Sequence, residues 1–243
     1  MYNGWYIMNK EVRRGYFPSD KNEFGIKSIE KLNKSAKNLY YLINEGYNVK
    51  SASTFVGNHY LLSERQRLAL ARAVSSQDNI NMRKSKEIRN NLEGITVNID
   101  GFNTIITLEV ALSNSTLLKC MDGTIRDLAG LRGTYRIIDK TEKALKLIGD
   151  ILEKEKIRKA IFYLDAPVSN SGNLKKSILN TLSIYDFEVE VHNINNVDGV
   201  LEKLENVITS DAIILDRCGS WINLNRKIIE GNVDRYSYVD FIY

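Results

Sequence analysis

Three short apolar runs, each ending in an aspartate, constrain the fold of this chain more than any other feature. The runs end at Asp100, Asp165 and Asp211. After the first of them, Gly101 lets the backbone turn, and Asn103 is placed to cap the helix that follows. We interpret each run as a strand that feeds a helix. Because strand carboxyl ends share one edge of an open parallel sheet, where ligands bind, the pattern predicts a single acidic pocket.

Apolar and polar stretches alternate through residues 93–243 as expected of an α/β domain. The pattern predicts strands at 95–99, 159–164, 187–192 and 207–209, and helices at 104–112, 139–156, 172–185, 197–205 and 224–229. An Asp-Gly pair at 122–123 predicts a hairpin. The strict alternation of 187–192 predicts a half-exposed strand near an edge of the sheet.

Residues 1–92 are expected to form a small all-α domain with a linker. The pattern predicts helices at 23–45, 50–56 and 64–74, with Ser63 and Gln66 spaced as a capping box, and then a polar connecting helix or linker at 77–94. Arg65 and Arg72 lie seven residues apart and share a helix face. That face fits a plain bundle, a non-specific phosphate-binding surface or a duplex-reading helix-turn-helix, although the turn is long for the last of these.

The net charge differs between the predicted helical part and the predicted α/β part of the chain. Residues 1–94 hold 16 Lys and Arg against 9 Asp and Glu, a net +7, and the remainder holds 18 against 21, a net −3, which together give the overall +4. The division predicts that the first part attracts a polyanion and that the second holds a cation. Solvated lysines would produce the same totals.

The few cysteines and histidines limit the metal chemistry. Cys120, Cys218, His59 and His192 are the only residues of these types, and they show no zinc-type spacing. A metal would therefore have oxygen ligands, which favours Mg²⁺ or Mn²⁺. No apolar run approaches the roughly 20 residues of a membrane-spanning helix, and the first residues lack a secretion signal. We expect a cytoplasmic protein without membrane contact.

The aspartate motifs resemble those of a known superfamily. Three segments are similar, in order and approximate spacing, to the acidic motifs of PIN-like proteins, especially the NYN branch: Ile99-Asp100-Gly101-Phe102-Asn103, Phe162-Tyr163-Leu164-Asp165 and Ile208-Thr209-Ser210-Asp211. This resemblance covers residues 95–230, and the whole chain resembles the domain of unknown function 434 family. It implies a PIN-like parallel-sheet domain over 93–243, preceded by the all-α domain, and a metal-dependent ribonuclease or related nuclease.

The resemblance also implies a set of catalytic carboxylates. Asp100, Asp165 and Asp211 match the metal-site positions of the superfamily, so Asp100 and Asp211 are expected to bind metal directly and Asp165 to complete the metal site. A further acid is expected on a helix between the first two aspartates, where Glu142 is the best match and Glu109 the competitor. The alternative is structural, because aspartates at strand-to-helix junctions commonly cap helices.

A glycine- and arginine-rich loop follows the predicted hairpin and could bind substrate. Arg126, Arg132 and Arg136 offer guanidinium groups for phosphates, and Tyr135 could stack on a base. The alternative is a hairpin extension whose arginines pair with nearby aspartates. We also expect substrate contacts from the predicted cap residue Asn103 and from Arg65 and Arg72 of the helix at 64–74.

These features predict a metal-dependent phosphodiester hydrolase that acts on single-stranded or structured RNA, with Mg²⁺ or Mn²⁺ as cofactor. One rival is a nucleic-acid or ribonucleoprotein binding module in which the acidic site is vestigial. Another is a metal-dependent phosphohydrolase of small nucleotides.

Overall fold

The structure is a computed structural model that describes residues 12–131 and 133–241. Its first part contains α1 (Asp20–Glu23), α2 (Ile26–Asn44), α3 (Val49–His59), α4 (Glu64–Ala73) and α5 (Gln77–Lys86). Its second part contains β1 (Thr96–Asp100), α6 (Gly101–Leu112), β2 (Thr116–Lys119), β3 (Ile125–Asp127), α7 (Asp139–Lys154), β4 (Lys159–Asp165), α8 (Ser171–Leu182), β5 (Glu188–Ile194), α9 (Val197–Leu201), β6 (Val207–Ile208), α10 (Ala212–Arg217), α11 (Leu224–Asn232) and β7 (Ser237–Asp240).

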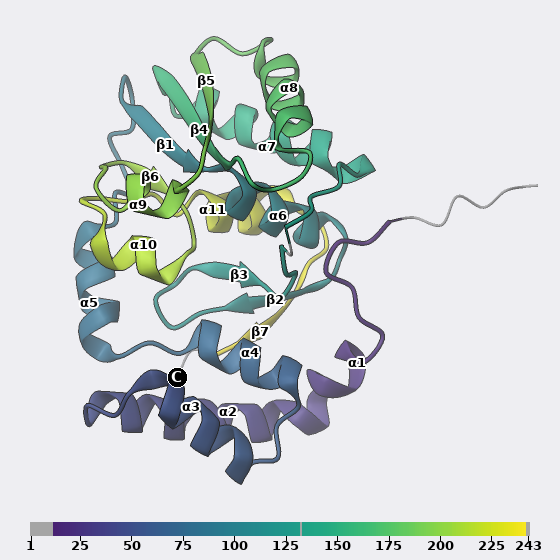
Figure 1. Ribbon diagram of the computed structural model, residues 1–243, viewed down its shortest axis with the longest axis vertical. Coiled ribbons are helices and arrows are strands. Elements are labelled where there is room, and N and C mark those ends of the chain that lie inside the picture. The colour runs from purple at the N-terminus through teal and green to yellow at the C-terminus, as the bar shows by residue number, and fades with distance from the viewer. Residues whose placement is uncertain (1–11, 132, 242–243) are drawn as a thin grey trace, which may run out of the picture.

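The larger sheet has the strand order β5-β4-β1-β6, and every neighbouring pair is parallel. Val97 and Ile99 of β1 and Phe162 of β4 point to one face, where they are fully buried in the core that α6, α7 and α8 complete (Figure 1). The short helices α9 and α10 cover part of the other face, around the buried Trp221. The prediction of a parallel α/β part preceded by helices is confirmed, as is the place of 187–192 at an edge.

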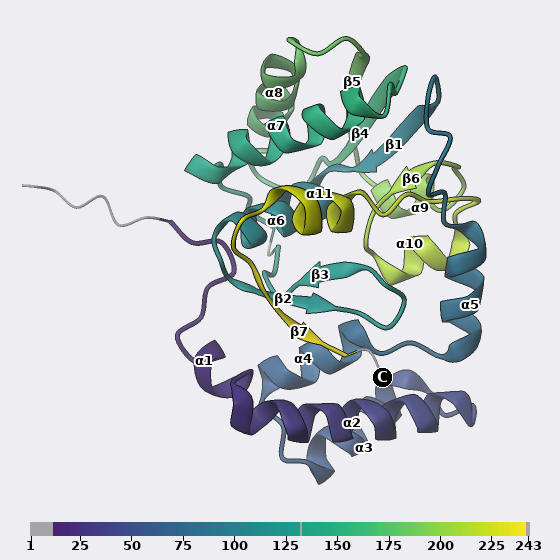
Figure 2. The same ribbon diagram turned by 180° about the vertical axis from the view of Figure 1, so that it is seen from behind.

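A second, smaller sheet joins the two parts of the molecule. The predicted hairpin of β2 and β3 is present, and β7, which the sequence pattern did not predict, pairs in parallel with β2. Leu118 and Val239 from these strands are buried together with Leu39 and Leu70 of the N-terminal helices. Figure 2 shows the C-terminal segment descending from α11 to lie between β2 and α4. The core of the helical part is therefore completed by strands from the second part.

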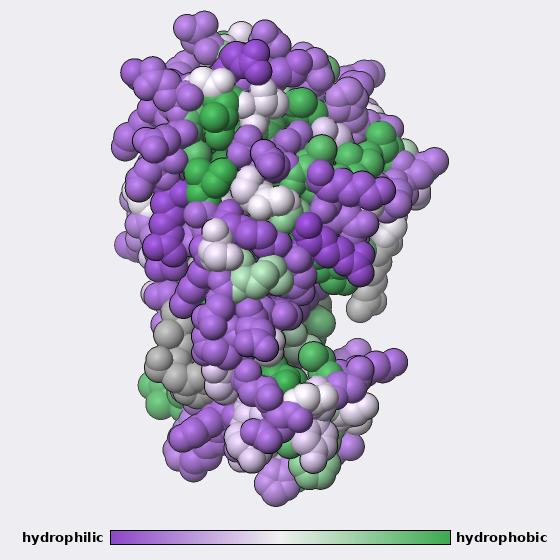
Figure 3. Space-filling view, turned by 90° about the vertical axis from the view of Figure 1, so that its left-hand side faces the viewer, coloured by the Kyte–Doolittle hydropathy of each residue, from purple (hydrophilic) through white to green (hydrophobic). Residues whose placement is uncertain are grey.

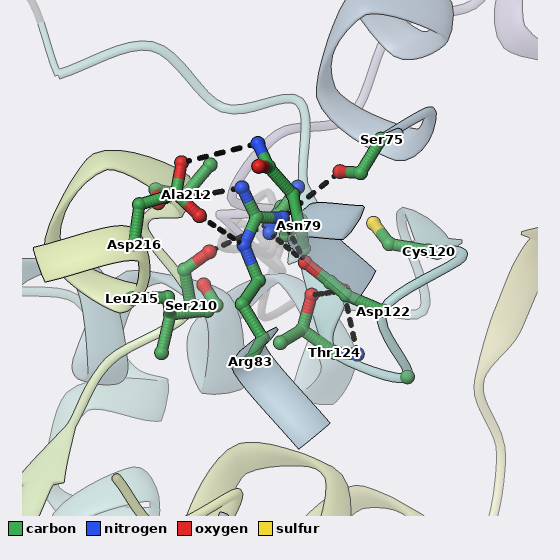
Figure 4. Close-up of polar contacts among 12 residues, drawn as sticks. Ser75, Asn79, Arg83, Cys120, Asp122, Thr124, Ser210, Ala212, Leu215 and Asp216 are labelled. Carbon is green, nitrogen blue, oxygen red and sulfur yellow. Dashed lines mark hydrogen bonds and ion pairs between the residues drawn. The ribbon is translucent and has the colours of Figure 1, made fainter. Parts of the chain in front are cut away.

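Helix α5 is a packed element between the two parts. The Arg83 side chain is 2% exposed, and its guanidinium contacts Asp216 of α10 at 2.6 Å and Asp122 of the hairpin turn at 2.7 Å (Figure 4). Trp221 Nε1 donates to the Arg83 backbone oxygen at 2.7 Å. These contacts fix α5 against the hairpin turn, α10 and Trp221. None of the described helices is long and apolar enough to cross a membrane.

The start of α6 differs from the prediction by one turn. The helix begins at Gly101, and Asp100, rather than Asn103, is its N-cap. A Cβ atom at Gly101 would lie 2.5 Å from the Leu164 side chain and 3.0 Å from the Tyr163 backbone oxygen. Glycine is thus required here because the first turn of α6 packs directly against β4.

Gly101→Ala should destabilise the fold. The added methyl group must displace backbone as well as a side chain, so we expect the free energy of unfolding to fall by about 1–3 kcal/mol. Urea unfolding followed by circular dichroism measures the change. Gly172→Ala in α8 is the matched control, because no atom lies within 4 Å of its added Cβ. Equal stability of the two variants would contradict this account of Gly101.

Candidate functional site

The three predicted aspartates converge on one pocket. Its volume is about 510 Å³, and Asp100, Asp165 and Asp211 all line it. Two further aspartates, Asp127 and Asp198, share the same lining, together with two arginines, Arg72 and Arg126. Five carboxylates and two guanidinium groups thus meet at the carboxyl edge of the large sheet.

Strand register explains why the aspartates meet. Asp100 at the end of β1 pairs with Tyr163, two residues before Asp165, and β6 pairs with β1 just before Asp211. Two of the aspartates also cap helices. Asp100 accepts from the Asn103 backbone nitrogen at 3.4 Å, and Asp211 accepts from the Ile213 backbone nitrogen at 2.8 Å. Asp100 and Asp211 therefore cap helices and also converge on the pocket. In each side chain, Oδ1 accepts the capping hydrogen bond.

The segment 209–211 is held from two sides. Thr209 Oγ1 donates to Asp100 Oδ2 at 2.8 Å, and the Ser210 backbone nitrogen donates to Asn103 Oδ1 at 2.9 Å. From the hairpin, Arg126 Nε donates to the Ser210 backbone oxygen at 2.6 Å. Asn103 and Arg126 therefore position the loop that carries Asp211.

Burial and repulsion from neighbouring carboxylates raise the pKa of Asp100 and of Asp198. Asp100 is 7% exposed. Burial raises its pKa from 3.8 to about 7, against the hydrogen bond from Thr209 and with added repulsion from the Asp211 charge. Burial, and then the charges of Asp211 and Asp165, also raise the pKa of Asp198. A cation in this pocket would relieve the repulsion.

The donor set suits a hard cation held largely by water. All the candidate ligands are carboxylate oxygens, which Mg²⁺ and Mn²⁺ prefer. Within residues 12–131 and 133–241, no group of three or more His, Cys, Asp or Glu side chains is arranged to hold a metal. Mg²⁺ commonly binds through only one or two carboxylates and keeps several waters. The residues therefore fit a hydrated ion at Asp100 and Asp211 and do not fit a closed protein cage.

The structure does not bring the proposed fourth acid into this pocket. The Glu142 side chain is 65% exposed on α7 and pairs with Lys146 at 2.7 Å. Its competitor Glu109 is fully buried outside the pocket lining, where it accepts hydrogen bonds from Tyr135, Thr141 and Arg14.

The glycine- and arginine-rich loop is largely committed to internal contacts. Tyr135 is fully buried, so its ring has no face open to a base. Arg126 is buried and forms an ion pair with Asp122 at 2.5 Å, as the structural alternative expected. Arg136 is exposed, and its backbone oxygen accepts from Arg14. Arg132 lies outside the described residues.

The two arginines of α4 that the sequence singled out, Arg65 and Arg72, are held by contacts within the molecule. Arg65 forms an ion pair with Asp20, and its guanidinium lies 4.2 Å from the centre of the Phe17 ring. Arg72 donates to the Asp127 backbone oxygen and leaves 37% of its side chain exposed at the aspartate pocket. This face of α4 is packed rather than presented to a duplex, so the helix-turn-helix alternative has no recognition surface here.

Sequence reasoning missed two pocket residues. Asp198 lies four residues beyond the end of β5, in Asn196-Val197-Asp198-Gly199, so an acid that follows the one remaining parallel strand was a usable signal. Asp127 ends the hairpin strand β3, where it accepts from Thr107 Oγ1 at 2.7 Å. Nothing in the local sequence around Asp127 indicates that the hairpin reaches the edge of the large sheet.

Comparisons with known proteins divide the chain where its two parts meet. Residues 31–86 match the model of a protein of unknown function, DUF434, which confirms that resemblance for the helical part alone. Residues 89–227 match the model of a domain of unknown function, DUF5616. An uncharacterised protein of Methanocaldococcus jannaschii is 40% identical over 190 residues, which cover 77% of this chain and 89% of that protein. No solved structure matches. The chain therefore belongs to the DUF5616 family, with a DUF434 segment preceding that domain.

Proposed function

We propose that this protein is a PIN-like, metal-dependent phosphodiester hydrolase that cleaves RNA. The observation that carries the proposal is the convergence of Asp100, Asp165, Asp198 and Asp211 on one pocket at the carboxyl edge of a parallel sheet. Capping accounts for Asp100 and Asp211 singly but gives no reason for two more carboxylates beside them. Burial, with added repulsion from Asp211, raises the pKa of Asp100, and a bound cation would lower it again.

Each residue has a definite task in this proposal. Asp100 and Asp211 would hold Mg²⁺ or Mn²⁺, which neutralises the negative charge that develops on the phosphate. Asp198 is exposed and its pKa is raised, so its carboxylate is a stronger base for the proton of the attacking water. Arg72 is half-exposed at the pocket and would contact a phosphate oxygen.

One observation favours the rival binding function. As the described side chains stand, no three of them form a metal-ligating group. A module that binds RNA through its basic part, without hydrolysis, would need no metal-ligating group. The two functions differ in the role of Asp100, which is essential for cleavage and dispensable for binding.

Asp100→Asn should abolish cleavage. With Mn²⁺ and a labelled single-stranded RNA of mixed sequence, we expect the wild type to cleave and EDTA to stop it. The variant should lose more than about 100-fold in rate, the upper end for removal of an outer contact to a metal ligand. Asp234→Asn, at an exposed position outside the pocket, is the matched control and should cleave like the wild type. Absence of cleavage by the folded wild type would favour the binding module.

Asp100 should also make stability depend on pH. Its pKa in the folded protein is about 7 against an ordinary 3.8, so the folded state binds the proton more tightly than the unfolded state does. That contribution to stability is fully present below the ordinary pKa and is lost as the pH rises through the folded value. In EDTA, the stability of the wild type relative to Asp100→Asn should fall by a few kcal/mol over this range, at about 1.4 kcal/mol per pKa unit.

Chemical unfolding of both proteins across this pH range provides the measurement. Groups other than Asp100 titrate in both proteins, so the difference isolates this carboxyl. A pH-independent difference would show that Asp100 ionises as readily in the folded protein as in the unfolded chain.

A further inference from the structure

A second hollow adjoins the aspartate pocket. It has a volume of about 1350 Å³ and lies between the N-terminal helices α3 and α4 and the loop 128–130. We call it the interdomain cleft. Figure 3 shows the surface notched between the helical part, below, and the α/β part, above. Ala129 lines both the cleft and the pocket, and on α4 the cleft ends at Ala71, next to the pocket residue Arg72. The two hollows therefore adjoin each other at Ala129 and at the C-terminal end of α4.

Basic side chains outnumber acidic ones in the lining of the cleft, and two of the basic ones, Arg14 and Arg65, form ion pairs with Glu109 and Asp20. The lining holds four basic side chains, those of Arg14, Lys50, Arg65 and Arg67, against two acidic ones. Arg72 adds a further positive charge at the junction with the pocket. Lys50 is exposed at the start of α3. A polyanion drawn into the cleft would be led towards the carboxylates, whose own charge attracts a cation.

Apolar side chains are exposed between these charges. Phe17 and Val49 are each 49% exposed and Leu68 is 40% exposed, and all three line the cleft. Guanidinium and ammonium groups interleaved with an aromatic ring and aliphatic side chains are typical of surfaces that bind single-stranded nucleic acid, because the charges contact phosphates and the apolar groups pack on bases.

The dimensions favour a strand over a small molecule. Pockets for small ligands hold about 300–1,000 Å³, and the cleft exceeds this at about 1350 Å³. From Arg65 to Arg72 the α4 axis advances about 10 Å, which is the length of about three stacked nucleotides. Asp100 is 7% exposed at the far end of that path. One flexible strand can bring a phosphate to such a group, whereas the backbone of a duplex is held at the surface of a wide, stiff rod.

We infer that the interdomain cleft binds a single-stranded RNA segment and directs it into the aspartate pocket. The delivery of RNA to the aspartate pocket for cleavage rests on the proposed hydrolase function, but RNA binding in the cleft does not. The DUF434 helices then supply one wall of the substrate site, and loop 128–130 supplies the other.

The test uses the full chain and an RNA of about 16 uridines with a fluorescent label. Fluorescence anisotropy in EDTA measures binding without cleavage. Lys50→Glu and Leu68→Glu each place a negative charge in the cleft and should weaken binding at least about fivefold. For Lys50→Glu the slope of log Kd against log salt should also fall by about 0.7, the value for one contact to a single strand.

Lys37→Glu is the matched control, because it makes the same charge change on α2, outside the cleft. It should bind like the wild type, and the same RNA annealed to its complement should bind more weakly than the single strand. Equal effects of Lys50→Glu and Lys37→Glu would overturn the inference, as would equal affinity for the duplex. If the cleft variants weaken binding but the wild type does not cleave RNA, the result would support RNA binding in the cleft and refute the hydrolase function. If the wild type cleaves RNA but the cleft variants bind normally, the result would support the hydrolase function and refute RNA binding in the cleft.

Discussion

The buried ion cluster around Asp122 is the interaction on which the rest of the arrangement depends. Burial opposes ionisation of Asp122, but the guanidinium groups of Arg126 and then Arg83 outweigh it, and its pKa is lowered. A buried ion pair with one partner missing is strongly destabilising, so the cluster holds its segments only as a complete set. Arg83 fixes α5, while Arg126 reaches the Ser210 backbone. The helical part is thereby connected, through one network, to the loop that carries Asp211.

The same network of contacts fixes the interdomain cleft and the aspartate pocket relative to each other. Arg72 lies where the basic cleft meets the acidic pocket, and its backbone oxygen accepts a hydrogen bond from Arg126. Helix α4, which lines the cleft, and the strand ends that line the pocket are therefore held together by this hydrogen bond. The same packed segments bury Asp100 and keep Asp211 beside it, and burial and then this repulsion raise the pKa of Asp100.

The sequence indicated the parallel sheet and the meeting of three aspartates because both follow from local patterns and a general rule of sheet topology. It did not indicate β7, whose parallel pairing with β2 depends on burying Val239 against the distant N-terminal helices. Tyr135 misled for a similar reason. An aromatic residue in a glycine-rich loop is expected to be exposed, but the ring of Tyr135 packs against the distant Phe102 and its hydroxyl donates to the distant Glu109, so it is buried. Glu142 was chosen by spacing from Asp100, and spacing does not determine which side of α7 faces the sheet edge.

Anomalous scattering from crystals of the full chain grown with excess Mn²⁺ tests the central claim most directly. If the converging aspartates form a cation site, an anomalous peak should lie in the pocket about 2 Å from a carboxylate oxygen of Asp100 and of Asp211. Water oxygens should complete its coordination shell. An ordered pocket without a peak, or Mn²⁺ bound only elsewhere on the molecule, would contradict the account.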